Sequence, residues 1–173
     1  MSLKPEVTKE DHMQGNANAP IELVEYGDYE CPYCGEAYGY MKKIKKKFGN
    51  DLKFVFRNFP LYNVHPHAMH AAIAAEVAGD HGKFWQMHDI LYENQNYLAD
   101  KNLLGYAEQL GIDAGQFEAA FSDSKYVEKV ESDLESGLRS GVNGTPSFFV
   151  NGQKYNGDYR SEDFLELLKS MID

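Results

Sequence analysis

Two cysteines, Cys31 and Cys34, stand two residues apart in the segment ECPYCG, and they are the only cysteines of the chain. A thiol pair at this spacing can form a disulfide and exchange it with another thiol. The attacking species is the thiolate, so the pKa of each cysteine decides how reactive the pair is. The chemistry therefore depends on the elements that hold Cys31 and Cys34.

A strand and a helix are predicted on either side of this pair. Residues 21–26 (IELVEY) are rich in strand formers and partly alternating, while residues 37–48 repeat apolar side chains at helical steps. Pro32 suits the first turn of that helix, which places Cys31 at its N-terminus and Cys34 one turn further in. Because the free N–H groups and the dipole of a helix N-terminus stabilise an anion, we expect a lowered pKa for Cys31.

Two other uses of the cysteine pair stay open. A CXXC segment is often half of a zinc site, which here would need two of the histidines His65, His67 and His70 to complete four ligands. A structural disulfide is the other use, although so short a loop restricts the unfolded chain very little. The strand–CPxC–helix context favours a redox pair over both.

The composition is that of a folded globule with an acidic balance. Lys and Arg number 17 against 27 Asp and Glu, a formal charge of −10, which argues against nucleic acid or an anionic membrane as the main partner. Residues 1–20 contain no apolar segment typical of a signal peptide, and no apolar run approaches membrane length. We therefore expect a cytoplasmic protein, or a periplasmic or other extracytoplasmic one if a leader has been removed.

The rest of the chain alternates between strand and helix signals. Residues 1–19 are polar and are interpreted as an arm outside the core. Residues 52–59 predict a second strand, and residues 63–140 favour helix throughout. Strand signals return at residues 147–155 around an Asn-Gly turn, and Ser161 is expected to cap a final helix.

The order of four segments gives the sequence a family resemblance. With CPYC after a strand, FRNFPL at the second strand, a helical insertion and GTPSFFVNG before a hairpin, the chain resembles the DsbA-like thiol–disulfide oxidoreductases of the thioredoxin superfamily. The resemblance implies an α/β thioredoxin fold, a central mixed β-sheet flanked by helices, with an inserted all-helical domain. The implied division is an arm (1–19), a thioredoxin domain (20–62 and 142–173) and the helical insertion (63–141).

The resemblance also implies roles around the cysteines. Cys31 would be the nucleophile and Cys34 would resolve the mixed disulfide, with Pro32 and Tyr33 tuning the pair. Glu25, six residues before Cys31, matches a buried acidic position that could accept or relay the proton of Cys34.

A second segment is expected to face the cysteines. Thr145 and Pro146 match the cis-proline loop of the family, whose backbone can pair with an extended substrate by β-addition. The resemblance thus assigns Thr145 and Pro146 to substrate binding.

The favoured function is a disulfide oxidase of DsbA type acting on protein or peptide thiols, with an unidentified redox partner that recycles it. Neither a cofactor nor a resident metal is expected. A cytosolic protein-disulfide or glutathione-linked reductase is the first alternative, because the two directions differ only in potential and recycling partner. A non-catalytic thioredoxin-fold module that binds peptide or metal is the second.

Overall fold

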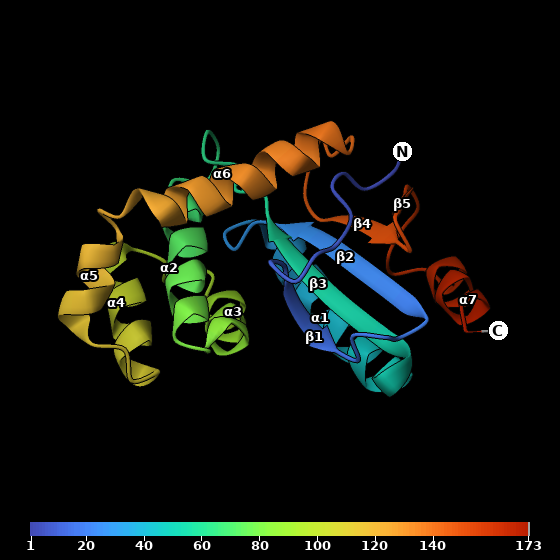
Figure 1. Ribbon diagram of the computed structural model, residues 1–173, viewed down its shortest axis with the longest axis horizontal. Coiled ribbons are helices and arrows are strands. Elements are labelled where there is room, and N and C mark those ends of the chain that lie inside the picture. Colours follow the sequence, from blue (N-terminus) through green and yellow to red (C-terminus); the bar gives the residue numbers. More distant parts are fainter. Residues whose placement is uncertain (173) are drawn as a thin grey trace.

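The computed structural model describes residues 1–172, so only the last residue of the predicted segment 142–173 lies outside the described part (Figure 1). The elements follow one another along the chain as β1 (His12–Gly15), β2 (Ile21–Gly27), α1 (Pro32–Phe48), the 3-10 turn η1 (Gly49–Asp51), β3 (Leu52–Asn58), α2 (Ala68–Asp80), α3 (Phe84–Glu93), α4 (Asp100–Gln109), α5 (Ala114–Ala120), α6 (Ser124–Arg139), β4 (Ser147–Val150), β5 (Gln153–Tyr155) and α7 (Glu162–Ser170).

The strands form one mixed sheet in the order β1-β3-β2-β4-β5. Strands β2 and β3 are parallel and are joined through α1, whereas β1, β4 and β5 each pair antiparallel to their neighbours. This arrangement confirms the predicted α/β thioredoxin fold with a central mixed sheet. It also places the end of β2, from which the CXXC segment departs, in the middle of the sheet.

Both faces of the central strands are buried. On one face Leu23 and Phe54 belong to a large apolar cluster shared with α1 and with the helices that follow β3. On the other face Val24 and Tyr26 form a smaller cluster, against which Leu134 of α6 packs. Both cysteines belong to the larger cluster, so the redox pair sits on the sheet face that α1 covers.

Helices α2 to α5 gather beside the sheet, and α6 runs from them across to it (Figure 1). α6 approaches the sheet closely at Gly137, where a Cβ atom would lie only 2.7 Å from the Phe59 ring. These helices fall between β3 and β4, inside the expected insertion 63–141. That this insertion and the segments 20–62 and 142–173 act as separate domains stays a prediction.

The interpretation of residues 1–19 as an arm outside the core is wrong. β1 is the edge strand of the sheet, with His12 opposite Phe56, and Leu3 is buried in the smaller cluster. The Asp11 carboxylate accepts two hydrogen bonds from the buried Arg57 guanidinium, at 2.8 and 3.0 Å. This polar segment therefore joins the fold through backbone pairing of β1 with β3 and through the ion pair of Asp11 with Arg57. It has no apolar periodicity that would have predicted this.

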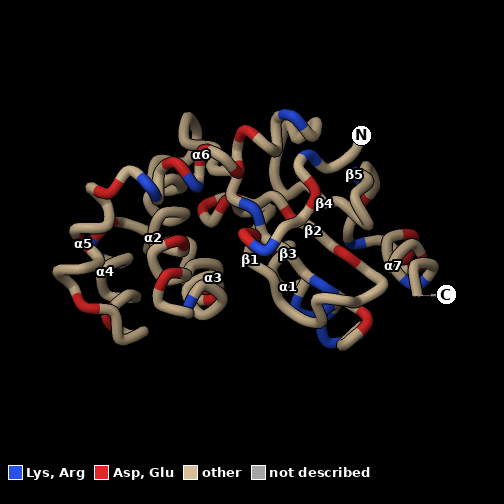
Figure 2. Tube along the Cα trace, in the orientation of Figure 1, with Lys and Arg blue, Asp and Glu red and all other residues tan. Residues whose placement is uncertain are grey.

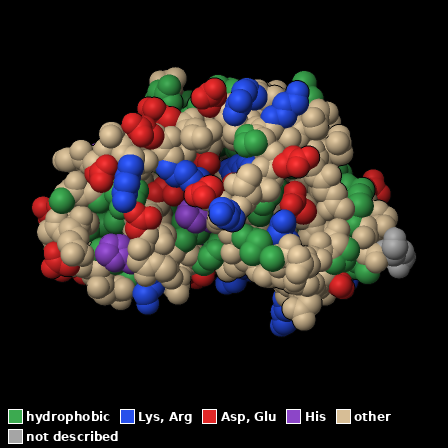
Figure 3. Space-filling model, in the orientation of Figure 1, with side chains coloured by type: hydrophobic (Ala, Val, Ile, Leu, Met, Phe, Trp, Pro, Cys, Tyr) green, Lys and Arg blue, Asp and Glu red, His purple; other side chains and the backbone are tan. Residues whose placement is uncertain are grey.

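Charged residues of both signs are distributed along the chain (Figure 2). On the face drawn in Figure 3, acidic and basic side chains are interspersed and neither sign covers it alone. The last turn of α1 carries Lys45, Lys46 and Lys47, which complement the negative end of that helix. Within residues 1–172, no helix is both long enough and apolar enough to cross a membrane.

Candidate active site

The redox pair lies where β2 gives way to α1. Cys31 is the N-cap of α1, Pro32 is the first helical residue, and Cys34 lies in the first turn, as expected. The N–H of Cys31 donates to the Asp28 carbonyl at 3.1 Å, which ties the start of the helix to the loop before it. Both thiols are free; Cys34 is fully buried and Cys31 is 4% exposed.

The surroundings of Cys31 favour its thiolate. A hydrogen bond from the Cys34 thiol, joined by the Thr145 side chain and the backbone N–H groups of Cys34 and Tyr33, lowers the pKa of Cys31 to about 5, although burial opposes this. Donors aimed at a sulfur stabilise its charged form. The direction agrees with the expectation from the helix N-terminus, but the first cause is the partner cysteine.

The loop before β4 faces this sulfur. The Thr145–Pro146 peptide bond is cis, and the Thr145 carbonyl lies 3.8 Å from Sγ of Cys31 and accepts its hydrogen bond. With Cys31 as a thiol, the buried Thr145 hydroxyl has no hydrogen-bond partner within residues 1–172, so it is free to donate once the thiolate forms. The structure thus brings together the two segments, around residues 31 and 145, that the sequence analysis assigned to one site.

Cys34 and Glu25 form a buried acidic pair behind Cys31. Burial raises the pKa of Cys34 well above its ordinary value, and the hydrogen bond to Cys31 and the charge of Glu25 add to the increase. Burial also raises the pKa of Glu25 to about 8, while the charge of Lys45 opposes the shift. One carboxyl oxygen of Glu25, Oε2, has no hydrogen-bond partner in the described part of the chain.

Glu25 is held rigidly because it lies on the central strand β2. It stands opposite Phe56 of β3 and Phe148 of β4, and the residue is only 2% exposed. At pH 7 its carboxyl group is therefore mostly protonated, and it can act as a proton donor or acceptor within the core.

Pro32 and Tyr33 form the outer side of the CXXC turn. Pro32 is exposed, and 69% of Tyr33 is accessible. The Tyr159 hydroxyl donates to the Tyr33 carbonyl at 3.4 Å, so the loop before α7 also reaches this turn. The two residues between the cysteines thus face solvent rather than the core.

Asp28 organises the loop before the cysteines, a role that the sequence analysis missed. Its carboxylate accepts from the backbone N–H groups of Glu30 and Leu61 and bonds Nδ1 of His65 at 2.8 Å. Burial alone would lower the pKa of His65, but Asp28 and the nearby Cys31 raise it. The sequence offers one signal for this role, because short aspartate side chains are typical of loops. It does not indicate the distant partners of Asp28, Leu61 and His65.

Gln95 is the second residue that the sequence analysis missed. Its Nε2 donates to the carbonyls of Tyr29 and Cys31, at 2.9 and 2.8 Å. Gln95 lies between α3 and α4, far along the chain from the cysteines, and no local motif includes it. The helical segment therefore contacts the redox turn directly.

The histidines proposed as zinc ligands are held in different places. His65 is bonded to Asp28, His67 is the N-cap of α2, and His70 pairs with Asp100 at 2.7 Å. Within residues 1–172, no group of three or more His, Cys, Asp or Glu side chains is arranged to hold a metal ion. The zinc alternative therefore lacks its ligand set in the described part of the chain.

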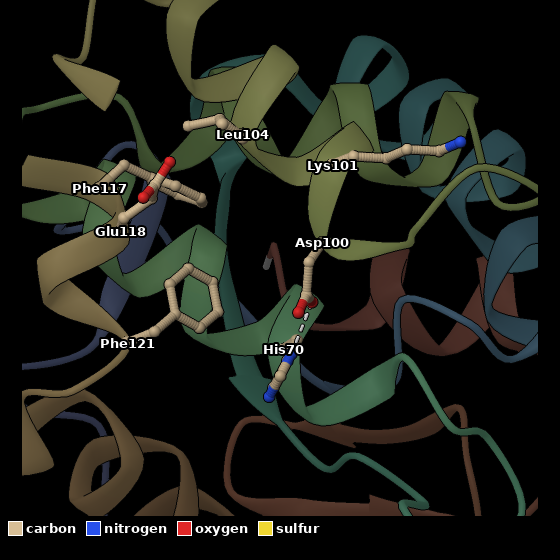
Figure 4. A pocket seen from close by; sticks show the side chains of 7 residues that line it. All are labelled: His70, Asp100, Lys101, Leu104, Phe117, Glu118 and Phe121. Carbon is tan, nitrogen blue, oxygen red and sulfur yellow. Dashed lines mark hydrogen bonds and ion pairs between the residues drawn. The ribbon is translucent and has the colours of Figure 1, made fainter. Parts of the chain in front are cut away.

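His70 and Asp100 line a hollow of about 310 Å³ between α2, α4 and α5 (Figure 4). Phe117 and Phe121 of its wall come from α5 and the residue that follows it. None of its lining residues belongs to the redox site, so this hollow is separate from it.

Residues 7–170 match the family described as Thioredoxin. The match covers most of the chain, so the chain belongs to this family, and its fold is that of the DsbA-like thiol–disulfide oxidoreductases. Cys31 and Cys34 form the CXXC pair at the start of α1. The predicted family resemblance is thereby confirmed.

Two solved structures illustrate the likeness of fold. BdbD from Bacillus subtilis, in its oxidised form, superposes with a TM-score of 0.88 at 24% identity, covering 99% of this chain and 97% of that one. The thiol–disulfide exchange protein alpha-DsbA2 from Wolbachia pipientis gives a TM-score of 0.79 at 20% identity, covering 94% and 88%. At these identities the comparison establishes the fold alone.

Curated relatives with higher identity carry another name. The Na(+)/H(+) antiporter NhaA 1 of Salinispora arenicola is 45% identical over 152 residues, which are 88% of this chain and 23% of that protein. The Na(+)/H(+) antiporter NhaA of Herminiimonas arsenicoxydans is 39% identical over 171 residues, 98% of this chain and 27% of that protein. The chain spans about a quarter of the length of these relatives, so their name describes much longer proteins.

Proposed function

We propose that this protein is a thiol–disulfide oxidoreductase that donates its Cys31–Cys34 disulfide to protein or peptide thiols. The observation that carries the proposal is the contrast between the two cysteines. Cys31, at the start of α1 and facing Thr145, has a pKa lowered to about 5, whereas the pKa of the buried Cys34 is raised. A stabilised Cys31 thiolate favours the reduced enzyme and so makes its disulfide a strong oxidant.

The exchange runs in two steps. A substrate thiolate attacks Sγ of Cys31, the Cys31–Cys34 bond breaks, and Cys34 leaves with the electron pair and takes up a proton. A second substrate thiolate then attacks the substrate sulfur of the mixed disulfide, and Cys31 leaves as a thiolate. The substrate becomes a disulfide and the enzyme pair is reduced by two electrons; Cys34 keeps one proton and solvent takes the other.

Glu25 supplies the proton in the first step. Its carboxyl, with a pKa of about 8, is mostly protonated at pH 7 and lies close enough to Cys34 for its charge to raise the pKa of that thiol. A leaving thiolate in this buried place is costly unless a neighbour protonates it. In the reverse direction the same carboxylate accepts the proton of Cys34.

Thr145 and the exposed CXXC turn receive the substrate. An extended segment paired with the backbone at Thr145 would carry its cysteine past Sγ of Cys31, which lies 3.8 Å from the Thr145 carbonyl. A separate oxidant of thiols must restore the disulfide after each turnover. The antiporter name of the longer relatives is not carried over to this chain.

The direction of exchange is tested by equilibrating the protein in glutathione buffers and measuring the reduction potential of the Cys31–Cys34 pair. A value of about −120 to −150 mV supports disulfide donation. A value near about −250 mV or below would instead support the reductase. Failure to form any Cys31–Cys34 disulfide would overturn the redox function itself.

The assignment of the two cysteines is tested with single serine variants. In the reverse direction, when the Cys31 thiolate attacks a substrate disulfide, Cys34→Ser should accumulate mixed disulfides that mass spectrometry detects, because no Cys34 thiol is present to resolve them. Cys31→Ser should form none and should lose activity in an insulin-reduction assay. Full activity of Cys31→Ser would contradict the assignment of Cys31 as the nucleophile.

A further inference from the structure

Gln95 is the amide side chain of the helical segment that touches the redox turn. It lies in the loop between α3 and α4, 64 residues after Cys31, and is half-buried. The exchange steps proposed above assign it no part. Its contacts nevertheless reach the residue whose sulfur reacts.

Both hydrogens of the Gln95 amide are directed at the turn before α1. Nε2 donates to the Tyr29 carbonyl at 2.9 Å and to the Cys31 carbonyl at 2.8 Å. Within residues 1–172, the Tyr29 carbonyl accepts no other hydrogen bond, whereas the Cys31 carbonyl also accepts the first bond of α1, from Gly35 N–H at 3.1 Å. One side chain thus fixes two carbonyls on either side of Glu30.

The other face of the same amide packs against Gly35. A Cβ atom there would lie 2.7 Å from Cδ of Gln95 and would overlap its Oε1. Because the amide fills the space that any larger side chain would need, residue 35 must be glycine while Gln95 holds its place. The glycine of ECPYCG therefore has a physical partner in the helical segment.

The two hydrogen bonds of Gln95 hold the backbone whose N–H groups point at the sulfur of Cys31. The N–H groups of Tyr33 and Cys34 stabilise the Cys31 thiolate only if the first turn of α1 keeps its direction relative to Sγ. With Tyr29 and Cys31 held by Gln95, the turn is fixed at its entry. A water molecule could replace one donor but would not hold both carbonyls in one geometry.

We propose that Gln95 is a positioning residue of the redox site, which sets the reactivity of Cys31 by holding the turn from Tyr29 to Gly35. The inference rests on the proposed function and extends it, since the helical segment then takes part in tuning the redox pair. Gln95 does not touch the reacting sulfurs and acts through the backbone of Cys31.

The test compares four variants of the full chain, and one control variant, with the wild type. Gln95→Met and Gln95→Ala remove both donors, the first while keeping the length and neutrality of the side chain. Gly35→Ala pushes the amide aside without altering it, and its combination with Gln95→Ala closes a mutant cycle. Asn94→Ala is the matched control, because within residues 1–172 the neighbouring Asn94 side-chain amide donates only to the Ile90 carbonyl of α3, at 2.8 Å.

The readouts are the pH dependence of Cys31 alkylation and the equilibrium constant with glutathione. Gln95→Met and Gly35→Ala should each raise the alkylation midpoint by about half to one pH unit and weaken the disulfide as an oxidant about three- to tenfold. The double variant should differ little from Gln95→Ala alone, because the glycine matters only while the amide is present. Asn94→Ala should leave both readouts unchanged even where it lowers the melting temperature.

Unchanged alkylation profiles and glutathione equilibria in folded Gln95→Met and Gln95→Ala would overturn the proposal. Additive effects of the Gly35 and Gln95 changes would do so as well, since the two would then act separately. If one variant does not fold, the others still decide. Failure of the proposed function is distinguishable, because it is judged from the wild-type protein, by a potential of about −250 mV or below or by the absence of any Cys31–Cys34 disulfide. The alkylation profile needs no turnover.

Discussion

Three titrating groups of the redox site have pKa values displaced in different directions by their places in the fold. Donors around its sulfur lower the pKa of Cys31, while burial raises those of Cys34 and Glu25. These opposite pKa displacements separate Cys31, which reacts as a thiolate, from Cys34 and Glu25, which exchange the proton. Glu25 also carries an energetic cost, because its ionised form is unfavourable in the core.

Replacing Glu25 by glutamine should stabilise the protein at neutral and higher pH. A carboxyl whose folded pKa is raised, here from 4.5 to about 8, destabilises the fold increasingly as pH rises from the unfolded value through the folded one. Glu25→Gln removes this cost, roughly 3 kcal/mol at pH 7. Urea unfolding of the reduced protein between pH 5 and 9 measures it.

The matched control is Glu22→Gln on the same strand, whose side chain is 25% exposed and pairs with Lys53. It should not give the stabilisation at neutral pH that is expected of Glu25→Gln, because this side chain lies outside the core. Equal pH dependence in Glu25→Gln and the wild type would mean that Glu25 does not ionise as a buried acid of raised pKa. Stopped-flow resolution of the mixed disulfide should also be slower in Glu25→Gln, because Cys34 loses its proton partner.

Among the elements, α1 and the first strand of the sheet differ most in how far sequence predicts them. The apolar repeat of α1 and the proline after Cys31 are local signals, and the helix begins at Pro32 as they indicate. β1 has only four residues and sits at the sheet edge, where pairing with β3 rather than its own pattern makes it a strand. Its anchor, the Asp11–Arg57 pair, joins residues 46 positions apart.

This anchor gives a stability prediction for the N-terminal segment. Asp11→Ala leaves the Arg57 guanidinium, 3% exposed, without its charged partner. Removing one partner of a buried pair costs about 3 kcal/mol or more. Urea unfolding should register this loss, whereas Asp158→Ala, which breaks the exposed pair with Arg160, should change stability little. Equal losses of stability in Asp11→Ala and Asp158→Ala would contradict the role of Asp11 as an anchor of the N-terminal segment.

The candidate site follows the same division between local and distant signals. Cys31 and Cys34 are placed by a short segment that the sequence reveals. The same holds outside the site for Asn151 and Gly152 of the β4–β5 hairpin, both with positive φ. Gln95 contacts the redox turn from 64 positions along the chain, and Asp28 joins this turn to Leu61, 33 positions away. No spacing rule finds these contacts. Such partners are fixed only when the helical segment packs against the sheet.

At the scale of the whole molecule, the redox state should control stability. The Cys31 thiolate is stabilised in the folded reduced protein. It is not stabilised in the unfolded chain, where the thiol keeps its ordinary pKa of about 8.5. The thiolate therefore adds to the free energy of unfolding only in the reduced form. A disulfide whose reduction stabilises the fold in this way is a stronger oxidant. The cytoplasmic location expected from the sequence stays a prediction, and a strong oxidant there would need a dedicated recycling partner.

The Cys31 thiolate should contribute about 2 to 3 kcal/mol more stability to the reduced protein at pH 7 than at pH 4. Glu25 acts in the opposite direction in both redox forms, so the comparison between the two forms is what shows the thiolate. A group whose folded pKa is depressed contributes stability that is fully present above its unfolded pKa and is lost as pH falls through the folded value, here about 5. Urea unfolding of both redox forms at each pH isolates the effect, because the oxidised form has no thiolate. A reduced form whose stability advantage does not shrink below pH 5 would contradict this origin.

The pH dependence of Cys31 alkylation in the reduced wild-type protein, followed together with thiolate absorbance, tests most directly whether the fold stabilises the Cys31 thiolate. We expect a single midpoint near pH 5, with Cys31 modified and Cys34 protected. A midpoint near the ordinary cysteine value of about 8.5 would mean that the helix start, Cys34 and Thr145 do not stabilise the thiolate, and would contradict the proposed oxidant.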